Sequence, residues 1–317
     1  MQKQQYMKIV FLDRLTLGDT PLGPIAELGE LVTYPNCSPE DARKNVADAE
    51  VIIINKTIVD KALMDAAPKL KLICVAATGV NNIDLEEARR RGIPVKNVAG
   101  YSTDSVVQET FMHILSLAGN GPYFDNRVKS GDYSRDGLFT DVSRPFVELA
   151  GKTLGIIGMG AIGSKVAKVG EAFGMSVIYF STSGTNHCKL YPAVTLETLL
   201  ADSDVVSIHS PLNDRTKGLI GKDELKRMKP SAFIVNMGRG GIIDEAALAE
   251  AIDKEWIAGA ATDVYVSEPI EADNPLLHTR HSERLRFTPH TAWASNEART
   301  RLVDAIAENI KSFLRGE

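Results

Sequence analysis

The sequence predicts an α/β protein with two Rossmann-like, doubly wound parallel-sheet domains joined by two long helices. Short apolar runs alternate with helical patterns along the chain, which is typical of βαβ units and parallel sheets. The chain has 317 residues, and domains commonly contain about 100–200 residues each. A glycine-rich turn of the dinucleotide-binding type lies near the middle of the chain.

The first third of the chain carries the first series of elements. Helical patterns at Pro39–Ala47 and Asp84–Arg91 lie between apolar runs, and a long helix is expected at Thr103–Ala118. Glycines and a proline at residues 119–122 are expected to end this helix. The expected strands are Lys8–Asp13, Leu31–Pro35, Val51–Asn55, Leu70–Ala76 and Val95–Val98.

The second series follows a looser stretch at Ser130–Leu149. Helices are expected at Ala161–Phe173 and Ser295–Leu314. The expected strands are Thr153–Gly158, Val177–Phe180, Val205–His209, Ala232–Asn236 and Ala258–Val264. We therefore expect one discontinuous domain of residues 1–102 and 292–317, and a second domain of residues 103–291.

Composition and charge exclude several classes of partner. The formal net charge is −5 without a block of like charge, whereas duplex nucleic acid demands a basic face. No apolar run approaches the ~18 residues of a membrane span, and the start MQKQQYMKIVFLD has no secretory signal core. The cysteines, Cys37, Cys74 and Cys188, lack metal-ligand spacing, and their odd, sparse count fits a reducing compartment. We expect a cytoplasmic protein that binds no metal, nucleic acid or membrane.

The glycine-rich turn follows a β-branched strand and opens a helix, the context in which G-x-G-x-x-G predicts dinucleotide binding. Gly158 allows the tight turn, Gly160 lets the backbone approach a pyrophosphate, and Gly163 lets the helix pack on the strand. The N–H groups of Ala161 and Ile162 are expected to face the negative charge. The alternative is a purely structural turn.

The position expected to bind the adenosine ribose carries hydroxyl groups. An acid commonly stands about 20 residues after the glycine turn, but Ser181, Thr182 and Ser183 occupy this stretch. The stretch contains neither a carboxylate to repel a 2′-phosphate nor an arginine to attract one. NAD and NADP therefore both remain open, and we expect less than ~100-fold discrimination between them.

Four stretches place polar residues directly after strands, where ligands bind in open α/β sheets. They are His209–Pro211, Asn236–Gly241, Thr262–Pro269 and Thr288–Trp293. Carbonyl reduction needs a cation for a substrate carboxylate, an acid for the carbonyl oxygen, and a group that keeps this acid protonated.

Arg239, His290 and Glu268 fit these three roles, since a neighbouring carboxylate favours the imidazolium form. Taken singly, these residues could equally be a surface ion pair, a helix-start histidine and a loop carboxylate. Their conjunction at strand ends favours a joint catalytic role.

These motifs resemble the D-isomer-specific 2-hydroxyacid dehydrogenases over essentially the whole chain. The motifs that carry the resemblance are TLGIIGMGAIGSKVA (Thr153–Ala167), VNMGRGGIIDEAAL (Val235–Leu248), GAATDVYVSEP (Gly259–Pro269), TPHTAW (Thr288–Trp293), AATGVNNID (Ala76–Asp84) and AGYSTDSVVQETF (Ala99–Phe111). The resemblance implies that the first lobe binds substrate and closes on a dinucleotide-binding lobe.

The resemblance also implies residue roles. Arg239 would bind the substrate carboxylate, His290 paired with Glu268 would donate the proton, and Asp263 would meet the nicotinamide carboxamide. Further cofactor contacts are implied for Thr103, Val107, Ser181, Ser210, Pro211, Met237 and Gly238. Substrate contacts are implied for Thr78, Gly79, Val80 and Trp293. Lys56, just after a strand, is a further candidate to meet a substrate hydroxyl or phosphate, or is simply a solvated lysine.

Two departures from the family pattern stand out. Met237-Gly238 replaces the frequent Thr-Ala before the arginine, and Ser181 replaces the ribose-binding acid. Within the family the chain is most similar to glycerate dehydrogenases, also called hydroxypyruvate reductases. The expected reaction converts hydroxypyruvate or glyoxylate with NAD(P)H to D-glycerate or glycolate. The alternatives are a dinucleotide-sensing, corepressor-like binding protein and a phosphite-type oxidoreductase.

A homodimer is also expected. The helix at Thr103–Ala118 carries an apolar face that is wider than one lobe needs, similar proteins pair through the cofactor domain, and two-fold dimers are the commonest oligomers.

Overall fold

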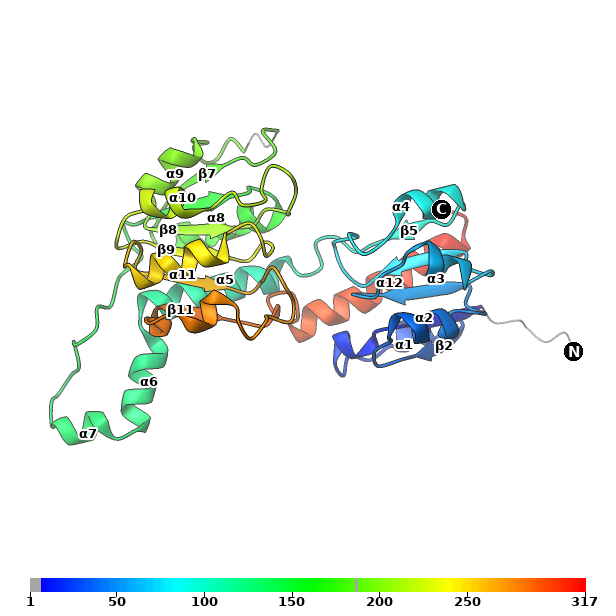
Figure 1. The fold of residues 1–317 in the computed structure, drawn as a ribbon, viewed down its shortest axis with the longest axis horizontal. Coiled ribbons are helices and arrows are strands. Elements are labelled where there is room, and N and C mark those ends of the chain that lie inside the picture. The colour runs from blue at the N-terminus through cyan, green and yellow to red at the C-terminus, as the bar shows by residue number, and fades with distance from the viewer. Residues whose placement is uncertain (1–6, 186–187) are drawn as a thin grey trace, which may run out of the picture. The chain divides into compact units, whose positions relative to one another are not determined.

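A computed structural model describes residues 7–185 and 188–317, and the chain divides into two compact units (Figure 1). Unit 1 comprises Met1–Ser102 and Ala294–Glu317, and unit 2 comprises Thr103–Trp293. Both units are α/β structures, as the sequence predicted. Within the described ranges, no helix combines the length and hydrophobicity needed to span a membrane.

Within residues 7–102 and 294–317, unit 1 is built on a five-stranded parallel sheet. Its strands are β1 (Lys8–Phe11), β2 (Glu30–Thr33), β3 (Val51–Ile54), β4 (Leu72–Val75) and β5 (Val95–Lys96). Its helices are η1 (Arg14–Leu17), α1 (Gly23–Ala26), α2 (Pro39–Asn45), α3 (Lys61–Asp65), α4 (Leu85–Arg90) and α12 (Asn296–Leu314). The strand order β2-β1-β3-β4-β5 is that of a doubly wound sheet.

The C-terminal helix α12 completes unit 1 by packing against α1 and β4. Ser295 caps its first turn by accepting a hydrogen bond from the N–H of Ala298. Its buried residues recur at three- and four-residue intervals: Ala298, Leu302, Val303, Ile306, Ala307 and Ile310. This spacing is why an amphipathic helix could be predicted there.

Within residues 103–185 and 188–293, unit 2 is built on a six-stranded parallel sheet. Its strands are β6 (Thr153–Ile157), β7 (Ser176–Phe180), β8 (Val205–Ile208), β9 (Phe233–Asn236), β10 (Gly259–Thr262) and β11 (Leu285–Phe287). Its helices are α5 (Thr103–Ala118), α6 (Gly121–Lys129), α7 (Asp132–Asp136), α8 (Ala161–Ala172), α9 (Leu196–Asp202), α10 (Lys222–Arg227), α11 (Glu245–Asp253), η2 (Pro275–His278) and η3 (Ser282–Arg284). The order is β11-β10-β9-β8-β6-β7, so the direction of winding reverses at β6.

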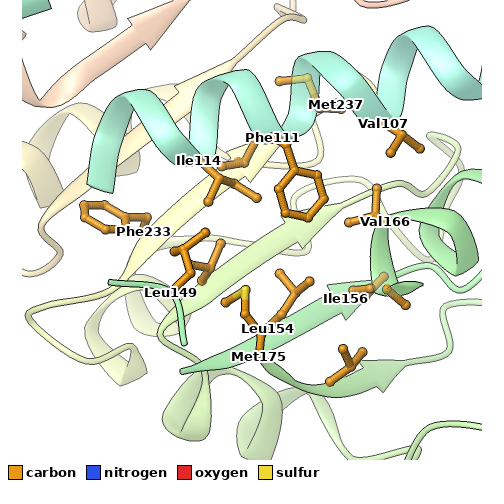
Figure 2. Close-up of a cluster of buried hydrophobic side chains, with 14 of the residues drawn as sticks. Val107, Phe111, Ile114, Leu149, Leu154, Ile156, Val166, Met175, Phe233 and Met237 are labelled. Carbon is orange, nitrogen blue, oxygen red and sulfur yellow. The ribbon is translucent and has the colours of Figure 1, made fainter. Parts of the chain in front are cut away.

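The helix α5 lies over the sheet of unit 2 and buries its apolar face there (Figure 2). Val107, Phe111 and Ile114 join one buried cluster with Met237, and the ring of Phe111 stacks on Phe173 with centroids 5.4 Å apart. The face that was expected to be wider than one lobe needs is largely covered by α8, β9, β10 and β11 of the same unit, whereas Leu115 on this helix is 44% exposed.

The elements of unit 2 that the sequence analysis did not predict, among the described residues, are α6, α7, α9, α10, α11, η2, η3 and β11. Residues 119–122 end α5, as expected, but Pro122 also stands in the first turn of α6, a position that favours proline. The looser stretch contains α7. The three-residue strand β11 has Arg286 at its centre and so forms no apolar run. Most expected strands extend past the observed ones at the C-terminal end, because their last residues already turn into polar loops. β7 instead begins one residue earlier than expected, and β9 begins one residue later.

Candidate active site

Three loops carry the predicted catalytic residues to one edge of the unit 2 sheet. Arg239 follows β9, Glu268 follows β10, and His290 follows β11. These strands are consecutive neighbours in a parallel sheet, so their carboxyl ends lie at the same edge. This edge is where open α/β sheets bind ligands.

The side chains of His290 and Glu268 form a half-buried pair. Nδ1 of His290 lies 2.7 Å from Oε2 of Glu268, and the two side chains are 21% and 30% exposed. The N–H of Tyr265 donates to Oε1 of Glu268 at 3.1 Å, which holds the carboxylate in place. His290 has φ of 55°, a left-handed conformation that is uncommon for residues other than glycine. Its N–H donates to the carbonyl oxygen of Asp263 at 2.9 Å.

The buried carboxylate of Asp263 organises the loop around His290. Oδ1 accepts hydrogen bonds from the N–H of Thr291 at 2.7 Å and from the hydroxyl of Thr288 at 2.8 Å. Oδ2 accepts from the N–H of Ala292 at 3.0 Å. Burial nevertheless raises the pKa of Asp263 to about 6. Asp263 thus positions His290 from both sides of the loop.

Arg239 projects from a loop that packs against the loop of Glu268. The side-chain amide of Asn236 donates to the carbonyl oxygen of Arg239 at 3.0 Å, which fixes the turn after β9. A Cβ atom at Gly240 would overlap the carbonyl oxygen of Tyr265. Glycine therefore allows the close approach that brings the loops of Arg239 and Glu268 together. The Arg239 side chain is exposed. Its Nη1 donates to the carbonyl oxygen of Gly238 at 2.8 Å, and a guanidinium has five N–H donors in all.

A cavity of about 470 Å³ lies at the reversal point of the same sheet. It is lined by Gly158, Met159, Gly160, Ser181, Thr182, Ser183, His209, Ser210, Pro211, Asn213, Asp214 and Arg215. The helix α8 starts here without a side-chain cap, so its first N–H groups are available to an anion. A Cβ atom at Gly160 would meet no atom within 4 Å, which leaves room for a pyrophosphate.

Two buried polar atoms of this cavity have no hydrogen-bond partner among the described residues. They are Oγ of Ser181 and Nδ1 of His209. Burial lowers the pKa of His209 to about 3, so this side chain is neutral, and its Nε2 lies 2.8 Å from the hydroxyl of Ser207. Buried polar atoms are normally satisfied. The phosphate and ribose groups of a dinucleotide, which carry many hydrogen-bonding atoms, suit the residues that line this cavity and these two atoms.

Sequence reasoning missed an arginine beside the ribose position. Arg215, from the loop after β8, donates from Nη1 to the carbonyl oxygen of Ser183 at 2.7 Å. The two residues are 32 positions apart. The stretch after β7 itself contains no arginine, but Arg215 reaches this stretch from another loop. The signal that could have found Arg215 is the strand order, because the loops after β7 and β8 flank β6.

The remaining cofactor candidates lie in several parts of unit 2. Ser210 and Pro211 line the cavity, while Gly163 lies in the first turn of α8 with Ala161 and Ile162. Val107 and Met237 are buried in the hydrophobic cluster between α5 and the sheet (Figure 2). Gly238 is buried, and its N–H donates to the side chain of Asn236. Thr103 begins α5. Direct cofactor contacts of all these residues stay predictions.

The substrate candidates other than Arg239 and Trp293 lie in unit 1. Thr78, Gly79 and Val80 follow β4, and the hydroxyl of Thr78 donates to the carbonyl oxygen of Val98 at 3.0 Å. Lys56 follows β3 and lines a cavity of about 320 Å³. Trp293 is the last residue of unit 2. Among the described residues, no cluster of histidine, cysteine or acidic side chains could hold a metal.

Comparison with known proteins points to one family. The model of the D-isomer specific 2-hydroxyacid dehydrogenase NAD binding domain matches residues 111–292. Glycerate dehydrogenase of Methylorubrum extorquens is 37% identical over 98% of this chain and 97% of its own length. Hydroxypyruvate reductase of Blautia hydrogenotrophica is 34% identical over 98% of both chains. The solved structure of the TT0316 protein from Thermus thermophilus has a TM-score of 0.84 and 33% identity over 98% of both chains.

Proposed function

The chain belongs to the D-isomer specific 2-hydroxyacid dehydrogenase family, and we propose that it reduces hydroxypyruvate and glyoxylate to D-glycerate and glycolate. It is an oxidoreductase that uses a nicotinamide dinucleotide to interconvert a keto acid and a hydroxy acid. The observation that carries the catalytic assignment is the 2.7 Å contact between His290 and Glu268 beside the loop of Arg239. The choice of hydroxypyruvate rests on the similarity to the glycerate dehydrogenase and the hydroxypyruvate reductase reported above, and the choice of glyoxylate rests on the resemblance seen in the sequence motifs.

His290 is the proposed proton donor. When bound, the nicotinamide dinucleotide supplies the hydride for the substrate carbon. Because Nδ1 of His290 is committed to Glu268, Nε2 is the nitrogen that would give its proton to the carbonyl oxygen. Glu268 stabilises the imidazolium before this transfer and keeps the ring oriented. In the reverse direction the neutral imidazole accepts the hydroxyl proton.

Arg239 is the proposed anchor of the substrate carboxylate. Its planar guanidinium can bind a carboxylate through two parallel hydrogen bonds. We assign backbone groups of Thr78–Val80, together with Lys56 and Trp293, as further substrate contacts. In this proposal, unit 1 is the substrate-binding domain and unit 2 is the dinucleotide-binding domain.

We further propose that the protein is a cytoplasmic homodimer, with unit 2 facing the partner. Support for the dimer comes from the segment after α7 rather than from the buried face of α5. Leu138, Phe139, Val142 and Phe146 are 64–95% exposed, and such a group of apolar side chains is a mark of an interface. The free cysteines Cys37, Cys74 and Cys188 fit a reducing compartment.

A substrate panel tests the proposed function. Loss of nicotinamide absorbance would be followed with hydroxypyruvate, glyoxylate, pyruvate and phosphorylated keto acids, each with NADH and NADPH. Hydroxypyruvate and glyoxylate should give the highest kcat/KM, and the hydroxypyruvate product should be D-glycerate. Turnover with phosphorylated keto acids alone, or formation of L-glycerate, would contradict the proposal.

A further inference from the structure

We infer that this enzyme prefers NADP(H), and that Arg215 determines the preference by binding the 2′-phosphate of the adenosine ribose. The inference rests on the proposed function only in taking a nicotinamide dinucleotide as the ligand of the unit 2 cavity. It concerns the end of this cavity that is formed by the loops after β7 and β8. Neither loop contains a catalytic residue of the proposed mechanism.

The sheet order places these two loops on either side of the glycine turn. β6 lies between β7 and β8, and the turn after β6 is the proposed site of the pyrophosphate. The ribose of a dinucleotide bound there reaches the end of β7, which carries Ser181, Thr182 and Ser183. Arg215 meets this same stretch from the other side, through its hydrogen bond to the carbonyl oxygen of Ser183.

The loop that carries Arg215 is held in place by its neighbours. Thr216 is fully buried, and its hydroxyl donates to the carbonyl oxygen of Pro211 at 2.6 Å. The N–H of Arg215 donates to the side-chain oxygen of Asn213 at 2.9 Å. The guanidinium therefore projects from an ordered turn, so little flexibility is lost when it binds an anion.

The charge and hydrogen-bonding groups at this end of the cavity suit a phosphate. Arg215 lines the cavity and uses one of its five N–H donors on Ser183 among the described residues. The hydroxyl of Ser181 is buried there and has no hydrogen-bond partner within residues 7–185 and 188–317. The neutral His209 adds no charge.

Asp214 is the acidic residue among the described residues that line this cavity. Its exposed carboxylate could in principle bind ribose hydroxyls and favour NAD instead. No residue from 181 to 189 is acidic, so the serine stretch itself offers no carboxylate to the ribose. Arg215, unlike Asp214, is tied to this stretch by a hydrogen bond. A 2′-phosphate carries nearly two negative charges at neutral pH, so it would form stronger hydrogen bonds with the Arg215 guanidinium than a 2′-hydroxyl would.

Binding of the two cofactors to the full-length protein tests the inference without any need for turnover. The dissociation constants of NADPH and NADH would be measured by their fluorescence at low and at raised salt. The wild type should bind NADPH about 10-fold to 100-fold more tightly than NADH, the range expected of hydrogen bonds between charged groups. This advantage should shrink as salt screens the phosphate.

Four variants separate the contributions. Arg215→Gln should weaken NADPH binding by about 10-fold or more and leave NADH binding unchanged. Ser181→Asp should reverse the preference, because a carboxylate repels the 2′-phosphate and binds the 2′-hydroxyl. Asp214→Asn should leave the preference in favour of NADPH. Arg227→Gln, an exposed arginine of α10, is the matched control and should change neither constant.

The outcomes distinguish this inference from the proposed function. Equal or tighter binding of NADH by the wild type, or equal weakening of both cofactors in Arg215→Gln, would overturn the inference even with an active reductase. Preferential NADPH binding without turnover of any keto acid would support the inference and overturn the proposed function. Failure to bind either dinucleotide would overturn both.

Discussion

Nδ1 of His290 and Oε2 of Glu268 lie 2.7 Å apart although the residues are 22 positions apart in the chain. Each follows a different strand, and the two strands are neighbours in the sheet. The N–H of Tyr265 fixes the carboxylate from behind, while Asp263 fixes the loop of the imidazole. Contacts within unit 2 thus hold the imidazole and the carboxylate in a fixed relative geometry, which is what an acid catalyst requires.

Arg239→Lys should separate substrate binding from cofactor binding. Lysine keeps the positive charge but loses the planar fork that matches a carboxylate. We expect the KM for the keto acid to rise by at least about 10-fold, with little change in cofactor dissociation constant. Steady-state kinetics and cofactor fluorescence would measure the two effects. A collapse of cofactor binding with unchanged KM would identify Arg239 as a cofactor residue.

Gly160→Ala should weaken cofactor binding without lowering the thermal stability of the protein. The added methyl group meets no protein atom within 4 Å, but it fills the space assigned to the pyrophosphate. We expect the dissociation constants of both cofactors to rise by more than about 10-fold while the midpoint of thermal unfolding stays constant. Gly121→Ala, also in open space, is the matched control. Unchanged affinity in Gly160→Ala would place the pyrophosphate elsewhere.

Asp263→Asn should change how stability depends on pH. Burial raises the pKa of Asp263 to about 6, so between pH ~4 and 6 the native protein holds a proton that the unfolded chain releases. The contribution of Asp263 to the free energy of unfolding is therefore largest below pH ~4 and falls as the pH rises to 6. Asparagine does not titrate, so the difference between wild type and variant should narrow by roughly 2 kcal/mol over this window. Urea unfolding at pH 4, 5 and 6 would measure it, and a constant difference would contradict the assignment.

The proposed homodimer should depend on the exposed apolar segment after α7. Light scattering at micromolar concentration should give twice the mass of the 34.4 kDa chain. Phe139 is 95% exposed, and Phe139→Asp should shift the protein toward monomer because a buried unpaired charge is unfavourable at an interface. Leu15→Asp, at an exposed leucine of unit 1, should not. A wild-type protein of monomeric mass would overturn the dimer.

The sequence was most informative where local patterns coincide with strand ends. The buried strands of parallel sheets appear as continuous apolar runs, so the fold class could be predicted, and it is confirmed. The polar stretch after the run Ala258–Val264 then indicated Glu268, and the polar stretch Thr288–Trp293 indicated His290. Their contact follows from the adjacency of β10 and β11, although β11 itself was missed because Arg286 interrupts its apolar character.

The sequence was least informative where a contact depends on the order of strands in space. Arg215 reaches Ser183 because β7 and β8 both flank β6, and no pattern around either residue indicates this. The start of α6 was missed for a different reason. Gly121 and Pro122 are ambiguous signals. Glycine and proline commonly follow the end of a helix, but proline is also common in the first turn of a new one.

The pH dependence of keto acid reduction in wild type and Glu268→Gln tests the catalytic assignment most directly. His290 must carry a proton when the keto acid is reduced, and Glu268 stabilises that protonated form. The variant should lose kcat mainly at neutral and alkaline pH, so that its profile moves to lower pH, while cofactor affinity is retained. His290→Ala should lose about 10²–10⁴-fold at every pH. If Glu268→Gln leaves the profile unmoved, Glu268 is an exposed loop carboxylate and the proposed acid pair is wrong.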